Sequence, residues 1–228
     1  FASINPEEIS LFERAFPKFR KNYHRIFYYS AEDVFNVGAK RMDGPDVLVG
    51  NSATPTNNHL ELLYQLKKLD LGDRNLVVPL NYGNQAYAEK IEKKGRAMFG
   101  TRFVALREFI PLEEYYNLIS RCSTIMMNHI RQQAATTIAT GLYKGAKVYL
   151  RNQNIVFPFY RKMGMRVWSL QDDLKPGADL FGPLTEEEMT HNQAVLNEYW
   201  GHDAALRAIR ELELMASAKR EQQVGRAI

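Results

Sequence analysis

Four polar loops in this sequence carry residue types that bind phosphate or sugar, and each loop follows an apolar run. The loops are GNSATPTNN (50–58), NYGNQ (81–85), EFIPLEE (108–114) and NHIRQQAAT (128–136). In open α/β sheets, ligands bind outside the carboxyl ends of the strands. The chemistry of this chain is therefore expected where these loops lie together.

The first loop offers short hydrogen-bonding side chains just before a helix. Gly50 allows close approach to the backbone, while Asn51 and Ser52 supply amide and hydroxyl groups. Asn57 and His59 fall at the start of the helix, whose unpaired N–H groups and positive dipole end suit phosphate oxygens. A simple helix cap at Thr56 or Asn57 explains this segment at least as well. The spacing matches neither GxGxxG nor a P-loop, so neither site is supported.

The last loop combines a basic side chain with a second helix start. Asn128 and His129 end an apolar run, Arg131 follows, and Gln132 and Gln133 are expected to open a helix of small residues. A fixed guanidinium at a helix N-terminus suits a diphosphate, because it adds bidentate contacts to the backbone donors. The alternative is an exposed arginine before a tightly packed helix. We favour the phosphate interpretation, because Arg131 is expected at the same sheet edge as the first loop.

The titratable residues give no metal or nucleophile motif. His59 and His129 are expected at the same edge, where either is a candidate acid, base or phosphate donor, although a lone histidine is more often structural. Cys122 and the scattered histidines lack zinc-ligand spacing. The adjacent Asp172 and Asp173 form no Asp-x-Asp motif, so a metal that clamps a sugar nucleotide is not expected. A serine hydrolase is poorly supported, because the chain has no GxSxG motif.

Apolar runs alternate with helical patterns, and the runs are nearly all apolar. This order predicts an α/β fold, a Rossmann-like parallel sheet with helices on both faces. The expected strands are residues 25–29, 46–51, 75–80, 102–108, 123–129, 146–150 and 166–170. The expected helices are residues 59–69, 85–98, 112–121, 133–143, 155–163, 185–200 and 203–219.

The two ends of the chain differ from its middle. Asn5 is expected to cap a helix rich in aromatic and basic residues, with Pro6 at its first position. That helix either packs on the domain, which we favour, or lies on an anionic membrane. TEEE at 185–188 is a capping pattern for the first of two terminal helices.

The composition limits the class of protein. The chain has 228 residues, 45% of them hydrophobic, enough for one large α/β domain or two small ones. A net charge of +4 suits an anionic ligand, and no nucleic-acid partner is expected. One cysteine excludes an internal disulfide and fits a reducing compartment. No apolar run reaches the ~20 residues that span a bilayer, and no signal peptide is present. Because the chain begins at Phe1, we expect a longer protein.

Three segments, taken as a set, are similar to one enzyme family. VLVGNSATPTNNHLELL (47–63), NLVVPLNYGNQAYAEKI (75–91) and IRQQAATTIATGLYKGAKVYL (130–150) resemble the TDP-N-acetylfucosamine:lipid II N-acetylfucosaminyltransferase (4-alpha-L-fucosyltransferase) family. The shared features are a strand ending in VGNS, a helix opening with Asn-x-His, a VVP-x-x-Y strand end, and Arg-Gln-Gln before a small-residue helix. The resemblance covers residues 26–174.

The resemblance implies a GT-B glycosyltransferase, in which two Rossmann-like domains face a cleft. It implies transfer of an acetamido-deoxy sugar such as N-acetylfucosamine, without a metal or other cofactor. The donor would be a dTDP-sugar, and the acceptor a polyprenyl-diphosphate-linked oligosaccharide of surface polysaccharide, such as enterobacterial common antigen. Residues 46–183 would form the donor-binding domain and 184–228 the terminal helices. Residues 1–45 would be the crossover from an N-terminal domain outside this chain, through which the cytoplasmic enzyme would contact the inner membrane.

The same resemblance suggests a role for each loop. The residues expected to touch the nucleotide sugar are Gly50, Asn51, Ser52, Asn57, His59, Tyr82, Glu108, Phe109, Asn128, His129, Arg131, Gln132 and Gln133. Arg131 and the Asn51 loop would hold the diphosphate. Glu108 and Phe109 would contact the base or ribose. Tyr82 and Asn128 would contact the sugar, and no catalytic base is assigned.

This sequence departs from the family at two points. Asn81 replaces a glycine, and the segment after Tyr82 is shorter, which leaves the donor sugar open. Two other functions fit the same architecture. One is a sugar-nucleotide epimerase, and the other is a sugar-nucleotide-binding module without turnover. The fragment alone is expected to transfer nothing.

Overall fold

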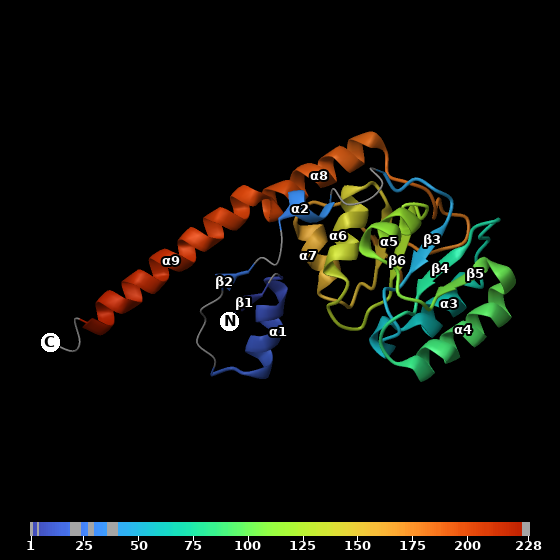
Figure 1. Cartoon of the computed structure of the whole chain (residues 1–228), viewed down its shortest axis with the longest axis horizontal. Coiled ribbons are helices and arrows are strands. Elements are labelled where there is room, and N and C mark those ends of the chain that lie inside the picture. The colour runs from blue at the N-terminus through green and yellow to red at the C-terminus, as the bar shows by residue number, and fades with distance from the viewer. Residues whose placement is uncertain (1, 4, 19–23, 27–29, 36–40, 225–228) are drawn as a thin grey trace.

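A parallel sheet of six strands forms the centre of the molecule (Figure 1). The computed structural model describes residues 2–3, 5–18, 24–26, 30–35 and 41–224. The sheet order is β5-β4-β3-β6-β7-β8. The strands are β3 (Val47–Val49), β4 (Leu76–Pro79), β5 (Phe103–Leu106), β6 (Thr124–Met127), β7 (Lys147–Leu150) and β8 (Trp168–Ser169). Parallel neighbours need a crossover, and a helix supplies each one here.

The strand order changes direction at β3. From β3 the chain adds β4 and then β5 on one side, and it then returns to place β6 on the other side of β3. In a sheet of this order, the loops after the two central strands diverge and leave a crevice between them. In this chain those loops are residues 50–58 and residues 128–134, and the sheet edge where they meet is here called the crevice.

Helices cover both faces of the sheet (Figure 1). One face carries α3 (His59–Leu66) and α4 (Gln85–Phe99), and the other carries α2 (Ala31–Phe35), α5 (Leu112–Ile119), α6 (Ala135–Tyr143), α7 (Val156–Lys162) and α8 (Glu186–Trp200). Because successive strand side chains point to opposite faces, Val47 and Val49 join the first core and Leu48 joins the second. All three are fully buried, which explains why this strand is apolar throughout.

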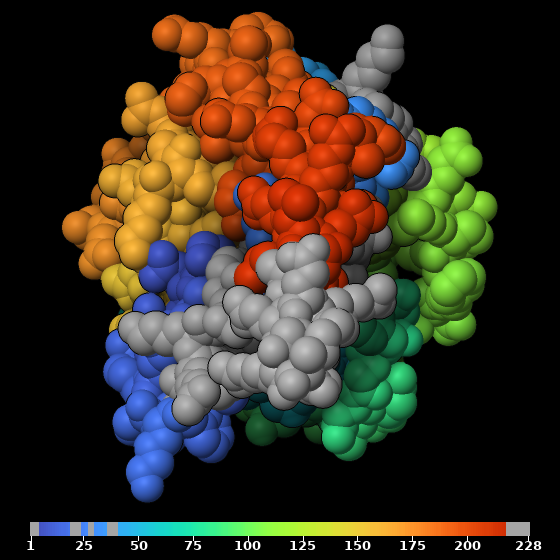
Figure 2. Space-filling view, turned by 90° about the vertical axis from the view of Figure 1, so that its left-hand side faces the viewer, coloured from blue at the N-terminus to red at the C-terminus, as the bar shows by residue number. Residues whose placement is uncertain are grey.

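The C-terminal helices begin with the expected capping box. The Thr185 hydroxyl accepts the N–H of Glu188 at 3.2 Å, and the Glu188 carboxylate accepts the N–H of Thr185 at 3.1 Å. Trp200, at the end of α8, is buried in the second core. α9 (His202–Val224) then projects away from the sheet (Figure 1). In Figure 2, α8 and the start of α9 lie at the top of the face that is shown, and α1 lies at its lower left.

The N-terminal segment forms a two-stranded sheet apart from the main sheet. β1 (Ala2–Ser3) pairs in parallel with β2 (His24–Arg25), and α1 (Glu7–Ala15) connects them. The helix begins at Glu7, so Pro6 occupies the N-cap position that was predicted for Asn5, although the side-chain oxygen of Asn5 accepts the N–H of Glu7 at 3.0 Å. The prediction of a strand over 25–29 was wrong at its start, because β2 ends at Arg25 and pairs with β1, outside the main sheet. Residues 27–29 lie outside the described residues.

The predicted fold class is confirmed. Each observed strand of the main sheet lies inside its predicted range and is shorter than that range. Gln132 and Gln133 were wrongly expected to open a helix. They belong to the preceding loop, and α6 begins at Ala135. No helix in the described part of the chain is both long and apolar enough to cross a bilayer.

Candidate functional site

The loops after β3 and β6 meet at the crevice. Val47–Val49 pairs residue by residue with residues 124–126, so the two strands reach the same sheet edge. The N–H of Ile130 donates to the carbonyl oxygen of Thr56 at 2.9 Å, which joins the two loops directly. The first and last of the four loops predicted from the sequence, 50–58 and 128–136, therefore lie together, as expected for loops that follow parallel strands.

Asn57 is the buried link between these loops. Its side-chain oxygen accepts the N–H of Asn51 at 2.9 Å and lies 3.0 Å from Nε2 of His129. Its Nδ2 donates to Oγ of Ser52 at 3.0 Å. The capping interpretation of Asn57 is not supported, because the position before α3 belongs to Asn58, which has left-handed backbone geometry (φ 54°). Asn57 instead fixes the shape of the loop.

A second set of contacts runs along the rim of the crevice. Nε2 of Gln133 donates to Oδ1 of Asn51 at 3.0 Å, and Oγ1 of Thr56 donates to Oε1 of Gln133 at 2.7 Å. Nδ2 of Asn51 in turn donates to the hydroxyl of Tyr82 at 2.9 Å. These half-buried or exposed amide and hydroxyl groups come from the loops after β3, β4 and β6. They present both donors and acceptors at one edge.

His59 supports the first loop from beneath. The Tyr87 hydroxyl accepts the backbone N–H of His59 at 3.3 Å and forms a hydrogen bond with Nδ1 of its ring at 3.2 Å. Nε2 of His59 lies behind Gly50, where a Cβ would come within 2.4 Å of it. Gly50 also has φ +68°. This position therefore needs glycine for two reasons, its backbone conformation and the space taken by His59.

Burial keeps both histidines neutral. It lowers the pKa of His59 to about 4, and it lowers the pKa of His129 to about 3 with help from His59 and Arg131. His59 is 1% exposed to solvent and His129 is 2% exposed. Because neither ring reaches the surface, we expect them to shape the crevice rather than to exchange protons with a ligand.

Arg131 lies exposed at the approach to α6. Its Nη1 donates only to the neighbouring Gln132 carbonyl at 3.2 Å, and no carboxylate pairs with it in the described chain. Nδ2 of Asn154 donates to the carbonyl oxygens of His129 and Arg131, both at 2.8 Å, and so fixes the backbone of this loop. Ala134, just before α6, adopts left-handed geometry (φ 58°), which is uncommon for a residue other than glycine. A fixed loop thus carries an unpaired cation next to a helix start.

An open cleft of about 260 Å³ adjoins Asn51 on the β5 side. Its walls include three exposed apolar side chains, Tyr82, Phe109 and Leu112. Tyr115 lies deeper, and burial raises the pKa of its hydroxyl. Glu108, which was predicted beside Phe109, is exposed and does not line this cleft.

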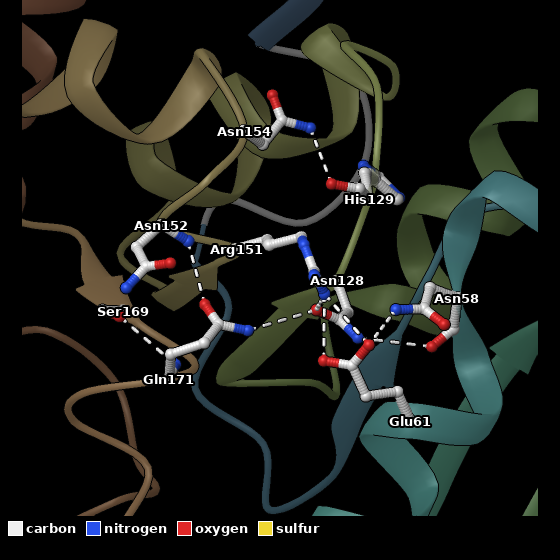
Figure 3. Close-up of polar contacts among 9 residues, drawn as sticks. All are labelled: Asn58, Glu61, Asn128, His129, Arg151, Asn152, Asn154, Ser169 and Gln171. Carbon is white, nitrogen blue, oxygen red and sulfur yellow. Dashed lines mark hydrogen bonds and ion pairs between the residues drawn. The ribbon is translucent and has the colours of Figure 1, made fainter.

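A further polar cluster lies on the other side of the crevice (Figure 3). The fully buried Asn128 accepts from Nη1 of Arg151 at 3.1 Å and donates to the carbonyl of Asn58 at 3.3 Å. The same Nη1 donates to both carboxylate oxygens of Glu61, at 2.9 and 3.1 Å. Gln171 also approaches Asn128, at 3.5 Å. Apart from Asn128, none of these residues was predicted, although Arg151 directly follows a predicted strand.

The structure thus places most of the predicted residues together, some at the rim of the crevice and others buried beneath it. Asn51, Tyr82, Arg131 and Gln133 present polar groups at the rim, whereas Ser52, Asn57, His59, Asn128 and His129 are buried supports. Gln132 instead accepts a hydrogen bond from Asn5 at 2.8 Å, and Glu108 stands apart. Within the described residues, no three His, Cys, Asp or Glu side chains are grouped closely enough to hold a metal ion.

This fold and site define an α/β domain of the Rossmann type found in GT-B glycosyltransferases. The sequence model of glycosyl transferase group 56, described as 4-alpha-L-fucosyltransferase, matches residues 12–176. The chain belongs to that family, as the sequence motifs indicated.

Solved structures share the fold at low sequence identity. Anabaena HepE in complex with UDP and glucose superposes with a TM-score of 0.66 at 11% identity, covering 95% of this chain and 62% of HepE. Sucrose-phosphate synthase from Thermosynechococcus elongatus gives 0.55 at 13% identity, covering 100% of this chain and 58% of the synthase. The N-terminal domain of Candida albicans trehalose-6-phosphate phosphatase gives 0.55 at 10%, covering 85% and 49%. The chain therefore spans about three fifths or less of these proteins.

Proposed function

We propose that this chain is the nucleotide-sugar-binding part of a glycosyltransferase. The observation that carries the proposal is the hydrogen bond from Gln133 to Asn51 across the crevice, at 3.0 Å, beside the unpaired Arg131. A cation, fixed amides and a helix N-terminus together suit a diphosphate. HepE, which has the same fold, was solved with UDP and glucose, and this supports a nucleoside diphosphate as the ligand.

Arg131 is the residue that we assign to the diphosphate. When a glycosyl bond breaks, negative charge develops on the departing diphosphate. A guanidinium that no carboxylate neutralises stabilises that charge, and the Asn154 contacts hold its backbone in place. We propose that this replaces the metal that other transferases use, so that transfer needs no metal or other cofactor.

The cleft beside Phe109 is the proposed site of the nucleobase. A planar base offers two apolar faces, which Phe109, Tyr82 and Leu112 are suited to cover. Asn51 and Thr137, at the same cleft, offer hydrogen bonds to ring or ribose atoms. Glu108 does not line the cleft, and we propose it only as a contact to the ribose from outside the cleft.

The substrates are proposed from the family. We propose a dTDP-activated acetamido-deoxy sugar such as N-acetylfucosamine as donor, and a polyprenyl-diphosphate-linked oligosaccharide as acceptor, in surface-polysaccharide assembly. We propose that the enzyme acts at the cytoplasmic face of the inner membrane, where it would meet such an acceptor. No described residue is proposed as the catalytic base.

The epimerase and the non-catalytic binding module remain the rivals. The test uses a longer protein that contains this chain, incubated with dTDP-N-acetylfucosamine and a lipid-linked acceptor. A transferase releases dTDP and lengthens the lipid-linked glycan. An epimerase converts the nucleotide sugar without acceptor and releases no dTDP. Binding with neither reaction would leave the non-catalytic module.

A further inference from the structure

The polar cluster of Figure 3, formed by Asn58, Glu61, Asn128, Arg151 and Gln171, has no role in the function proposed above. It joins the start of α3 to the carboxyl ends of β6, β7 and β8. Its buried centre is Asn128, which precedes His129 and the Arg131 loop. The cluster therefore lies at the same sheet edge as the proposed diphosphate site, on the side away from the Phe109 cleft.

Arg151 keeps unused donors at this edge. Nη1 of Arg151 donates to Glu61 and Asn128. Nε and Nη2 of Arg151 donate to no described residue. The Arg151 side chain is 21% exposed and that of Glu61 is 41% exposed. The guanidinium is thus held at one end while its other nitrogens face outward.

The charges of this pair balance each other. Burial tends to raise the pKa of Glu61, but hydrogen bonds from Asn58 and Arg151 outweigh it and hold the pKa below its ordinary value. Glu61 therefore stays ionised and offsets Arg151. A second anion would gain little here, whereas a neutral group that both donates and accepts hydrogen bonds fits well.

The remaining groups of the cluster are carboxamides. Gln171 accepts the N–H of Asn152 at 2.9 Å and is half-buried. Oδ1 of Asn152 is buried and accepts no hydrogen bond from a described residue, although buried polar atoms are normally paired. Carboxamides, a carboxylate and a guanidinium in fixed positions are the groups that hydrogen-bond to hydroxyl and acetamido substituents.

We infer that Arg151, Glu61 and Gln171 form a subsite for the hydroxyl or acetamido substituents of the glycosyl group of the nucleotide sugar. The inference rests on the proposed function, because it adds a site for the sugar to the proposed sites for the base and the diphosphate. The base lies at the Phe109 cleft, the diphosphate at Arg131, and the sugar at Arg151. Asn128 acts from below as a positioning residue.

A surface ion pair of no functional importance is the competing explanation, since exposed pairs contribute little to stability. The two explanations differ in what they predict for ligands with and without a sugar. The experiment is calorimetric titration of the 228-residue chain with dTDP and with dTDP-N-acetylfucosamine, for the wild type, Arg151→Gln and Glu61→Gln.

Arg96→Gln is the matched control. Arg96 also pairs with a glutamate, Glu92, at 2.9 Å, but it lies in the last turn of α4, at the opposite edge of the sheet. If Arg151→Gln fails to fold, as judged by its melting curve, Gln171→Ala replaces it, because Gln171 carries no charge and makes a long contact to Asn128.

We expect Arg151→Gln to weaken dTDP-N-acetylfucosamine binding by about tenfold or more, the loss of one charged hydrogen bond, and to leave dTDP binding unchanged. Arg96→Gln should change neither. Equal losses for both ligands, or no loss for either, would overturn the inference alone. A wild type that binds the sugar nucleotide no more tightly than dTDP would do the same. Failure of the wild type to bind dTDP at all would overturn the proposed function and this inference together.

Discussion

Nε2 of His129 donates a hydrogen bond to Oδ1 of Asn57 over 3.0 Å, and both residues are buried. The same oxygen accepts the N–H of Asn51. One carboxamide oxygen therefore ties the end of β6 to the loop after β3. This contact holds together the two loops that we assign to the diphosphate.

The buried, neutral histidines His59 and His129 make the stability of the fold sensitive to acid. Both pKa values, about 4 for His59 and about 3 for His129, lie below the ordinary value of 6.5. Between these values the unfolded chain binds more protons than the folded one, so stability rises with pH and is lost as pH falls below 6.5. The loss is on the order of 3 kcal/mol per histidine.

Thermal melting between pH 4 and pH 7 measures this dependence. His129→Gln should flatten the curve of melting temperature against pH. The exposed His202 provides the comparison, and His202→Gln should flatten the curve less than His129→Gln does. An unaltered slope in His129→Gln would contradict the assignment.

Gly50→Ala should destabilise the chain by two separate effects. Left-handed geometry at φ +68° costs an alanine about 1–2 kcal/mol, and the new Cβ would overlap His59 Nε2 at 2.4 Å. Gly177 is a matched control, because it has φ +82° but no heavy atom within 4 Å of a Cβ. Urea unfolding should show that Gly50→Ala costs about 1–3 kcal/mol more than Gly177→Ala, as expected for overpacking. Equal costs would mean that His59 does not restrict this loop.

Gln133→Ala should weaken nucleotide binding without removing a charge. It deletes the contacts to Asn51 and Thr56, which align the rim. Gln193→Ala is the control, because Gln193 donates a hydrogen bond of 2.9 Å to Tyr143 from α8, away from the crevice. We expect roughly tenfold weaker dTDP binding for Gln133→Ala, equivalent to one or two hydrogen bonds, and no change for Gln193→Ala. Similar behaviour of the two variants would argue against a role for the rim.

Thr185→Ala tests stability apart from binding. It removes half of the capping box of α8 and should cost about 1 kcal/mol of unfolding free energy. The dTDP affinity should stay at the wild-type value, because α8 lies away from the crevice. A large loss of binding would show that the terminal helices take part in the site.

The sequence predicted the crevice well, because one rule sufficed. Parallel strands end at a common edge, so Asn51 and Gln133 had to lie near each other once both strands were recognised. The rule also applies to Arg151, which directly follows the run 146–150, although Arg151 was not among the predicted site residues. Its partner Glu61 is three residues beyond Asn58 on α3, and that pairing depends on how α3 is turned against the sheet.

Burial was harder to predict than position. Asn57, His59 and His129 are polar and stand at loop ends, where most such side chains are exposed. Asn57 and His129 hydrogen-bond to each other and Asn57 also bonds to the loop backbone, whereas His59 contacts Tyr87 and its Nε2 has no hydrogen-bond partner among the described residues. No local pattern in the sequence reveals these contacts. Gln132 similarly turned toward Asn5, more than a hundred residues away in the sequence.

We propose that the crevice between β3 and β6 binds a nucleoside diphosphate through Arg131. The most direct measurement is a calorimetric titration of dTDP into the wild type, Arg131→Ala and Arg121→Ala. Arg121 is an exposed arginine just before β6, at the opposite end of the strand from Arg131. We predict that the wild type binds, that Arg131→Ala weakens binding by about tenfold or more, and that Arg121→Ala has no effect. A wild type that binds neither dTDP nor UDP, or an Arg131→Ala variant with unchanged affinity, would contradict the account.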